Sequence, residues 1–268
     1  MEPDGELVRD RLGLDGQVVR FEAGSLPVFA IGDDLVVKLF PPQHHAEVPT
    51  EVAVMEALHG RLPVPTPCFQ GIGVVDDWAC VLMSRLHGEE PAVPDVEVSR
   101  QVGEMLRALH AVEPPEVLGP ADWAAFVVGQ REKCVERQRE HGLDERWLER
   151  IPAFLDRVDL GDQPAVLLHT EVISAHLLWR NGMLSGLFDF EPAMRGAFEY
   201  EFASVGLFVT KGDRRCWAAL VDAYGRVPEP ERVMAYALLH VYSNMPWYMR
   251  EMPQGETFEE LAVRWFGA

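Results

Sequence analysis

The sequence is poor in basic residues, and this shortage excludes a class of partners. Its 24 Lys and Arg residues stand against 43 Asp and Glu residues, which gives a formal net charge of −19. A chain this acidic is repelled by a phosphate backbone, so we expect no nucleic-acid partner. The charge is compatible with a cationic substrate, whose approach an acidic surface accelerates, but it also serves solubility alone.

Close cysteine pairs and long apolar runs are absent as well. The four cysteines, at positions 68, 80, 134 and 216, are too scattered for a zinc site or a disulfide framework. No apolar run reaches the length of a membrane span, and the first residues are too polar for a signal peptide. We therefore expect no membrane association and a cytoplasmic location, as a monomer or a homodimer.

The first third of the 268-residue chain is rich in strand signals. Short β-branched or aromatic runs alternate with turns that contain Gly or Asp. An apolar repeat over Glu47–Leu58 predicts one helix after the third run, and Gly60 and Pro63 end it. We therefore predict a five-stranded lobe with one main helix, with strands over residues 17–21, 28–31, 35–40, 68–74 and 78–83.

The rest of the chain has the periodicity of helices. These are expected over residues 98–110, 123–142, 143–158, 200–209, 214–224, 230–242 and 257–266. Two short apolar runs predict strands over residues 166–169 and 184–190, joined through residues 177–180 and a turn at Asn181-Gly182. The sequence thus predicts an α+β fold with two lobes, residues 1–86 and residues 87–268.

Lys38 lies inside an otherwise apolar strand. A buried ammonium needs a carboxylate or a phosphate as its partner. Glu51, on the apolar face of the following helix, is the natural partner, and Glu47, one turn earlier, is the alternative. Because every second residue of a strand faces the other side, an outward-pointing Lys38 without a partner fits this strand equally well.

Two apolar runs of the second lobe end in ionisable residues. VLLHTEVISAHLL starts at Val166 and GLFDFEPAMRG starts at Gly186. The ends of strands are where a rigid scaffold presents catalytic groups. Asp189 stands between two phenylalanines, so it either faces solvent or is held by a cation.

The histidines of this region also allow a different chemistry. His169, Glu171 and the distant His240 match a site with two histidines and one carboxylate that holds iron, with Arg250 for an oxo acid. However, the segment around His240 has the pattern of a helix, whereas that kind of site uses a second strand. The motif is short and arises by chance, which makes the iron site the weaker hypothesis.

Together these segments resemble the aminoglycoside phosphotransferase family. That family shows His-Gly-Asp, four variable residues and Asn-Leu-Leu, and shortly afterwards Ile-Asp-Phe or Ile-Asp-Trp. Here LLHTEVISAHLLW precedes GLFDFEPAMRG, and VVKLF, VLMSRLHGE and LRALHAV extend the similarity over residues 24–205. The resemblance implies a protein-kinase-like fold and transfer of the γ-phosphate of ATP, or of GTP, to a hydroxyl of a small molecule with Mg²⁺.

The resemblance also implies roles for individual residues. Lys38 would contact the α- and β-phosphates with Glu51 as its partner. Glu171, in the catalytic loop that His169 opens, would orient the acceptor hydroxyl. Asp189 and His176 would hold magnesium, and Gly24 and Ser25 would cover the phosphates. The adenine slot would be lined by Met83, Ser84 and Leu86, and Glu201 would have a structural role.

Three positions of the catalytic loop depart from the family pattern. Glu171 replaces Asp and is longer by one methylene, roughly 1.5 Å, which is enough to impair a positioned group. His176 replaces Asn, although magnesium prefers oxygen ligands, and Thr170 replaces Gly. Three interpretations follow. The residues of the site have changed together and still transfer phosphate with a longer base, or the chain is a catalytically silent nucleotide-binding relative, or its histidines serve a different chemistry. The residues that are retained favour the first interpretation: Lys38, Glu51 and Asp189.

The acceptor site is the part that the sequence defines least. Aromatic side chains suit sugar faces and carboxylates suit amines. Trp217 is better explained as a core residue. An aminoglycoside, another sugar-containing antibiotic such as a nucleoside, or a metabolite such as homoserine or choline all remain open. The candidates for the acceptor site are Asp213, Tyr242, Trp247, Tyr248 and Glu251.

Overall fold

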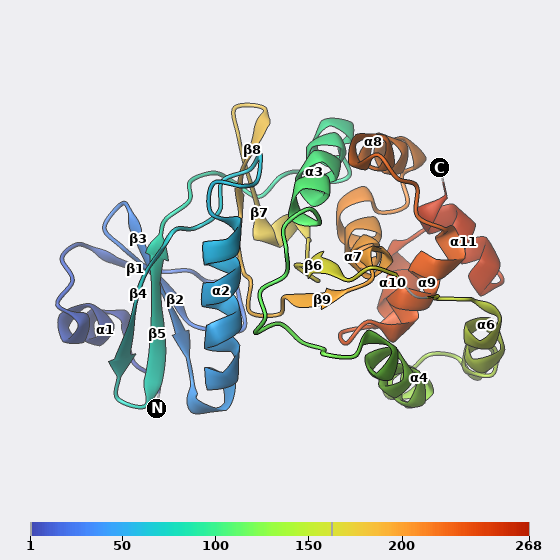
Figure 1. Cartoon of the computed structure of the whole chain (residues 1–268), viewed down its shortest axis with the longest axis horizontal. Helices are drawn as coiled ribbons and strands as arrows, with labels where there is room; N and C mark the ends of the chain where they lie inside the picture. Colours follow the sequence, from blue (N-terminus) through green and yellow to red (C-terminus); the bar gives the residue numbers. More distant parts are fainter. Residues whose placement is uncertain (1, 162, 268) are drawn as a thin grey trace.

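The strand signals of the first lobe correspond to one five-stranded antiparallel sheet (Figure 1). The computed structural model describes residues 2–161 and 163–267, and the predicted fold class is confirmed over them. The sheet has the order β1-β2-β3-β5-β4. Its strands are β1 (Val18–Arg20), β2 (Val28–Ile31), β3 (Leu35–Phe40), β4 (Phe69–Val75) and β5 (Trp78–Ser84).

Alternation along β3 decides which way Lys38 points. Val37 and Leu39 are buried in a small cluster on one face of the sheet, together with Val8 of α1 (Gly5–Leu12). Phe40 belongs to the main core on the other face. Since residues two apart share a face of a strand, Lys38 lies on the side of Phe40. Its ammonium therefore points toward the second lobe.

Two helices cover opposite sides of this sheet (Figure 1). The predicted helix is α2 (Val48–Leu58), which begins one residue later than expected because Glu47 closes the 3-10 turn η1 (Pro42–Glu47). Helix α2 buries Glu51 and Met55 against the core. The sequence patterns did not predict α1, which has only eight residues. Asp4 caps its start, where the carboxylate accepts a hydrogen bond from the Leu7 N–H.

The second lobe is mainly helical, as predicted. Its most extensive helix contact joins α3 (Val96–Leu109) to α8 (Arg214–Tyr224). Gly103 allows this close approach, because a Cβ there would lie 2.2 Å from the backbone oxygen of Leu220. The other helices are α4 (Trp123–Glu140), α5 (Glu145–Leu148), α6 (Ile151–Arg157), α7 (Phe198–Val205), the π turn η3 (Gly206–Thr210), α9 (Pro230–Leu239), α10 (Met245–Glu251) and α11 (Phe258–Phe266).

Three helices of this lobe differ from the prediction. The helix expected over residues 143–158 is divided into α5 and α6, where Pro152, which has no N–H to donate, lies in the first turn of α6. Helix α9 ends before residue 242, because the backbone of His240 is extended at ψ 141°. Sequence analysis missed α10, a seven-residue helix that starts at the Asn244 cap.

Two short antiparallel ribbons carry the loops between the lobes. Strand β6 (Val166–Leu168) pairs with β9 (Met194–Gly196), and β7 (Leu177–Arg180) pairs with β8 (Met183–Leu187). The strand expected to reach residue 190 ends at Leu187, because Asp189 has a φ of 79° and leaves the extended conformation. The ionisable residues singled out above therefore lie in loops that follow strands.

The connection between the lobes follows β5. Glu89 pairs with Trp179 of β7, so the connecting segment is hydrogen-bonded to the second lobe. The lobe boundary between residues 86 and 87 stays a prediction. Among the helices of the described residues, none is both long and apolar enough to cross a membrane.

Candidate active site

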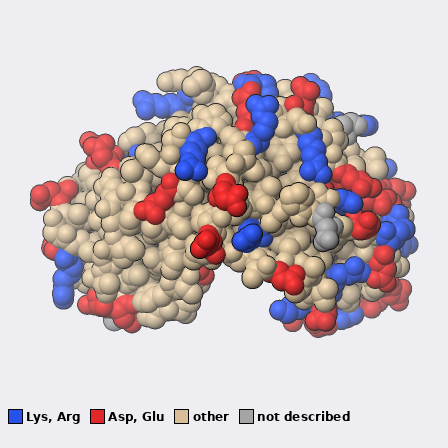
Figure 2. All heavy atoms as spheres, in the orientation of Figure 1, with Lys and Arg blue, Asp and Glu red and all other residues tan. Residues whose placement is uncertain are grey.

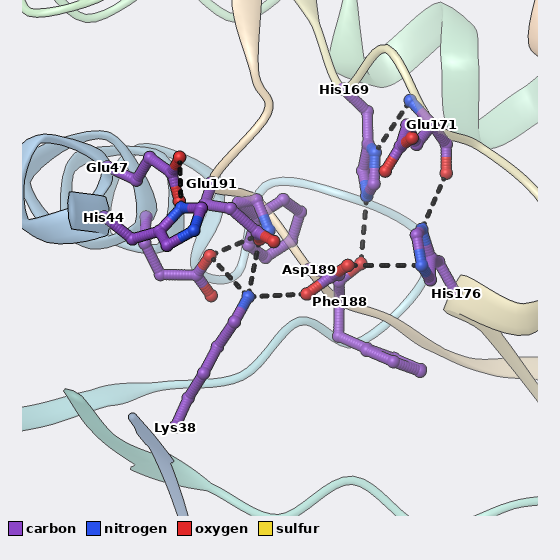
Figure 3. Close-up of polar contacts among 11 residues, drawn as sticks. Lys38, His44, Glu47, His169, Glu171, His176, Phe188, Asp189 and Glu191 are labelled. Carbon is purple, nitrogen blue, oxygen red and sulfur yellow. Dashed lines mark hydrogen bonds and ion pairs between the residues drawn. The ribbon is translucent and has the colours of Figure 1, made fainter. Parts of the chain in front are cut away.

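Lys38 is the centre of an ion cluster between the lobes (Figure 3). Its Nζ lies 3.2 Å from Glu51 Oε2, 2.5 Å from Asp189 Oδ1 and 2.5 Å from Glu191 Oε2. The side chain is 5% exposed. Burial alone lowers the pKa of Lys38, but the three carboxylates outweigh burial and raise it above its ordinary value. The lysine is therefore a permanent cation that several carboxyl groups share.

Of the two partners proposed for Lys38, Glu51 makes the contact. Glu51 Oε2 also accepts a hydrogen bond from the Phe190 N–H at 3.0 Å, so it fixes both the lysine and the Asp189 loop. Glu47 instead lies 2.8 Å from Nδ1 of His44.

Sequence analysis missed Glu191. Burial, with the nearby charges of Asp189 and Glu51, raises the pKa of Glu191 in spite of Lys38. The signal that could have found this residue is its spacing. It stands two residues after Asp189, with the fully buried Phe190 between them.

Asp189 divides its two oxygens between two partners. Oδ1 binds Lys38, and Oδ2 lies 3.1 Å from Nε2 of His176. Burial favours the protonated acid, but the charges of Lys38 and His176 outweigh it and hold the pKa of Asp189 near 2. The other ring nitrogen of His176, Nδ1, is 2.9 Å from the backbone oxygen of Glu171. Asp189 is therefore an ionised carboxylate held between two nitrogen groups.

Glu171 presents its carboxylate to the same place. Ligand atoms of Glu171, His176 and Asp189 all lie within 4.8 Å of one another. Burial raises the pKa of Glu171; the charge of Asp189 adds to this effect, while His176 and Lys38 oppose it. A raised pKa makes this carboxylate a stronger proton acceptor than an ordinary glutamate.

Two buried histidines support the loop around Glu171. Burial lowers the pKa of both His169 and His240 to about 4, so both rings are neutral near pH 7. All four ring nitrogens contact backbone groups, which leaves none for iron, and the iron-site hypothesis is wrong. The partners are Phe188 O (2.9 Å) and Glu171 N (3.4 Å) for His169, and Thr170 O (3.2 Å) and Tyr242 N (3.3 Å) for His240.

Glu201 holds the same loop from inside the core. Its Oε2 accepts hydrogen bonds from the N–H groups of His169 (2.6 Å) and Thr170 (3.2 Å). These bonds help keep Thr170 at a φ of 71°, a left-handed conformation that favours glycine and that costs a β-branched residue about 1–2 kcal/mol. Burial raises the pKa of Glu201 to about 7. The residue is fully buried, and its role in the structure is to hold the loop at His169 and Thr170 in place.

The raised pKa of Glu201 has a consequence for stability. Because the carboxyl group of Glu201 keeps its proton up to about pH 7 in the folded state and only up to the ordinary glutamate pKa of 4.5 in the unfolded state, the contribution to stability is complete below pH 4.5. It is lost as the pH rises through 7 and amounts to roughly 3 kcal/mol, at about 1.4 kcal/mol per pKa unit. In Glu201→Gln, which keeps an accepting oxygen and does not titrate, we expect a smaller fall of the unfolding free energy between pH 5 and pH 8.

Urea denaturation at four pH values checks this expectation. Glu132→Gln, on the exposed face of α4, is the matched control and should keep the wild-type pH dependence. An equal pH dependence in wild type and Glu201→Gln would show that Glu201 does not titrate as described.

Two cavities adjoin the cluster. The larger, of about 410 Å³, is lined by residues of β2, β3 and β5, and Lys38 of the ion cluster lines it as well. Gly24, in the loop that closes one side of this cavity, has a φ of 116°, a conformation that residues with a Cβ rarely adopt. All the residues that the sequence assigned to nucleotide and metal line this cavity: Gly24, Ser25, Lys38, Glu51, Met83, Ser84, Leu86, His176 and Asp189.

The smaller cavity, of about 80 Å³, lies on the other side of Glu171. Tyr242 and Tyr248 line it together with Leu207 and Phe208. Trp247 stacks on Phe208 with ring centroids 5.4 Å apart. Two aromatic candidates for the acceptor site therefore reach this cavity, and the third packs on its wall.

The structure does not bring the two acidic candidates to either cavity. The Asp213 carboxylate accepts hydrogen bonds from the N–H groups of Arg215 and Cys216, so it caps α8. Glu251 is exposed at the end of α10. Trp217 is fully buried, as the sequence led us to expect.

Comparison with known proteins gives a family match and a set of similar structures. The family model for the phosphotransferase enzyme family matches residues 17–236. Comparison with curated proteins gave no match. Aminoglycoside 2'-phosphotransferase-IIIa in its GDP complex is 16% identical, with 96% of this chain and 97% of that chain covered and a TM-score of 0.72.

Two further solved structures are similar over nearly the whole chain. A macrolide 2'-phosphotransferase from Brachybacterium faecium is 18% identical, with 96% and 95% of the two chains covered and a TM-score of 0.70. Spectinomycin phosphotransferase in complex with ADP and spectinomycin is 14% identical, with 96% of each chain covered and a TM-score of 0.68. At these identities the solved structures show the fold alone. The family match, in contrast, spans both lobes and every residue of the ion cluster, and the chain belongs to the phosphotransferase enzyme family.

Proposed function

We propose that this protein transfers the terminal phosphate of a nucleoside triphosphate to a hydroxyl of a small molecule. The observation that carries the proposal is the position of the ion cluster between two cavities. Lys38 and Asp189 line the larger cavity, and Glu171, whose ligand atom lies within 4.8 Å of that of Asp189, lines the smaller one. A phosphate donor and a hydroxyl acceptor would therefore meet at these residues.

The larger cavity suits a nucleotide. Its volume of about 410 Å³ lies within the usual range for small-molecule sites, roughly 300–1,000 Å³. Val36, Met83 and Leu178 give it apolar walls for a planar base, and Lys38 gives it a cation for phosphates. GDP and ADP in two of the similar structures support this assignment. We propose ATP as the donor, with GTP as the alternative.

The smaller cavity suits an acceptor with an apolar face. Its lining residues contain a single carboxylate, that of Glu171, beside aromatic and aliphatic side chains. On the face of the molecule in Figure 2, acidic and basic side chains are interspersed on both sides of the hollow between the lobes. At about 80 Å³ this cavity is below the usual range for a whole small-molecule ligand, so it would receive only the hydroxyl-bearing part of an antibiotic. A part that is neutral or carries one positive charge fits there better than a polycationic one.

The residues of the site divide the work of transfer. Lys38 binds phosphate oxygens and offsets the negative charge that moves during transfer. Glu171 orients the acceptor hydroxyl and takes its proton. Glu51 keeps Lys38 in place, and the hydrogen bonds of Glu201 keep Glu171 in place by fixing the loop before it.

The resemblance also implies Mg²⁺, and the donor set of this chain does not fit that ion. Asp189 and Glu171 offer oxygen atoms, but the third group, His176, offers a ring nitrogen. Mg²⁺ demands near-octahedral coordination by oxygen. We therefore assign no step of the transfer to Mg²⁺.

Tyr242 is the residue of the acceptor cavity that can be changed with the least risk to the fold, since it is 59% exposed. In Tyr242→Ala we expect the KM for the acceptor to rise by up to about tenfold, the equivalent of one lost aromatic contact. The KM for the nucleotide should stay the same, because Tyr242 does not line the larger cavity. Steady-state kinetics with each substrate varied in turn measures the two KM values. Equal changes in the KM for the acceptor and the KM for the nucleotide would contradict the prediction.

The proposed function is tested by acceptor-stimulated release of nucleoside diphosphate. ATP and GTP are each offered with neutral, singly charged and polycationic antibiotics, and with hydroxylated metabolites such as homoserine and choline. We expect stimulation by a neutral or singly charged acceptor with an apolar face. Binding of nucleotide without stimulation by any acceptor would instead favour a silent nucleotide-binding relative.

A further inference from the structure

The cluster of Glu171, His176 and Asp189 has the donor atoms of a transition-metal site. Glu171 lies after β6, His176 ends the 3-10 turn η2 (Ser174–His176) and Asp189 lies after β8. The three loops bring one nitrogen and two carboxylate groups together, with ligand atoms within 4.8 Å of one another. Ligand atoms at about 2.0–2.2 Å from one tetrahedral ion lie roughly 3.3–3.6 Å apart, so side-chain movements of up to about 1.5 Å close the site.

The hydrogen bond at Nδ1 of His176 determines what its other nitrogen can do. The backbone oxygen of Glu171 can only accept, so Nδ1, 2.9 Å away, carries the hydrogen. In the neutral ring, Nε2 then carries a lone pair and no hydrogen, and it lies 3.1 Å from Oδ2 of Asp189. Two acceptors at this distance need a cation between them, either a proton or a metal ion. Figure 3 shows the ring of His176 turned toward Asp189 in this way.

The surroundings of His176 and Asp189 are those of metal ligands. A histidine that binds a metal usually donates its second ring N–H to a carboxylate or a backbone carbonyl, as His176 does here. Asp189 is held by Lys38 through Oδ1, which leaves Oδ2 directed at the site. Both ligands are therefore oriented before an ion binds.

We propose that Glu171, His176 and Asp189 bind a first-row divalent transition-metal ion, such as Co²⁺, Zn²⁺ or Mn²⁺, in preference to Mg²⁺. Imidazole nitrogen suits these ions, and affinity for a mixed nitrogen and oxygen site rises from Mn²⁺ to Co²⁺. The inference rests on the site of the proposed function, but it does not need phosphate transfer to occur. Metal binding is measured without nucleotide or acceptor, so the two proposals can fail separately.

The experiment is a titration of chelator-treated, tag-free protein with Co²⁺ and with Mg²⁺. Calorimetry gives the affinity of each ion, and the visible absorption spectrum of Co²⁺ reports nitrogen coordination. We expect one Co²⁺ per chain, bound at least about tenfold more tightly than Mg²⁺. Equal affinities for the two ions, or no binding of Co²⁺ at all, would overturn the proposal; the second result would mean that a proton alone bridges His176 and Asp189.

A matched variant assigns the preference to one side chain. His176→Asn replaces the nitrogen ligand by an amide that can still donate to the Glu171 carbonyl, so the loop should keep its fold. We expect Co²⁺ affinity to fall at least about tenfold and Mg²⁺ affinity to stay the same or rise. His141→Asn, at an exposed position after α4, should change neither affinity. Unchanged Co²⁺ affinity and spectrum in His176→Asn would overturn the assignment.

Discussion

Glu171→Gln is expected to lower kcat for phosphate transfer by at least about 100-fold, because positioned general bases contribute roughly 10²–10⁴-fold. Glutamine keeps the size of the side chain but accepts no proton from the hydroxyl. Glu171 lines the acceptor cavity and not the nucleotide cavity, so the Kd for the nucleotide, measured without added divalent ions, should stay within about threefold of wild type. Steady-state kinetics and calorimetry measure the two quantities on the same preparation.

Two further variants sharpen this prediction. Glu171→Asp restores the residue that the family pattern shows but shortens the side chain by one methylene, so it should retain a part of the activity. Glu132→Gln, on the surface of α4, should leave activity unchanged. Near-normal turnover of Glu171→Gln would contradict the role of this residue as proton acceptor.

Lys38→Met is expected to remove nucleotide binding and to destabilise the fold. Lys38 is the shared cation of Glu51, Asp189 and Glu191, and its loss leaves buried carboxylates without a counter-charge. Breaking a buried ion pair by removing one partner costs about 3–5 kcal/mol. We therefore expect the free energy of unfolding in urea to fall by that amount and the nucleotide Kd to rise beyond the measurable range.

A double variant separates the two effects of this change. In Lys38→Met with Glu51→Gln, one uncompensated charge is removed, and the amide oxygen can still accept from the Phe190 N–H. Part of the lost stability should return, whereas nucleotide binding should not. Lys133→Met, exposed on α4, controls for loss of a lysine. If Lys38→Met unfolds at the same urea concentration as Lys133→Met, the ion cluster contributes nothing to stability.

Local patterns were enough to predict the architecture of the protein. Short β-branched or aromatic runs between turns that contain Gly or Asp indicate the five strands. Alternation left the direction of Lys38 open, since either face of β3 was possible. Tertiary packing decides it, with Val8 of α1 on one face and α2 and the second lobe on the other.

The acceptor cavity could not be predicted in the same way. It is built where α7, η3, α10 and the loop after α9 meet, and none of these contacts follows from sequence spacing. Asp213 shows the difficulty, because a carboxylate just before a helix serves as its cap more often than as a ligand. Glu191 shows the converse. It lies 153 positions after Lys38, so its contact with Lys38 depends on how the two lobes pack together.

The central claim is that the ion cluster and Glu171 transfer phosphate to a hydroxyl, and product mass tests it most directly. Wild type and Glu171→Gln are incubated side by side with ATP or GTP and the acceptor that most stimulates nucleotide release, and the acceptor is analysed by mass spectrometry. A gain of one phosphoryl group with wild type, and its absence or strong reduction with Glu171→Gln, is the expected result. An unchanged acceptor mass with wild type, at nucleotide and acceptor concentrations that saturate binding, would contradict the claim.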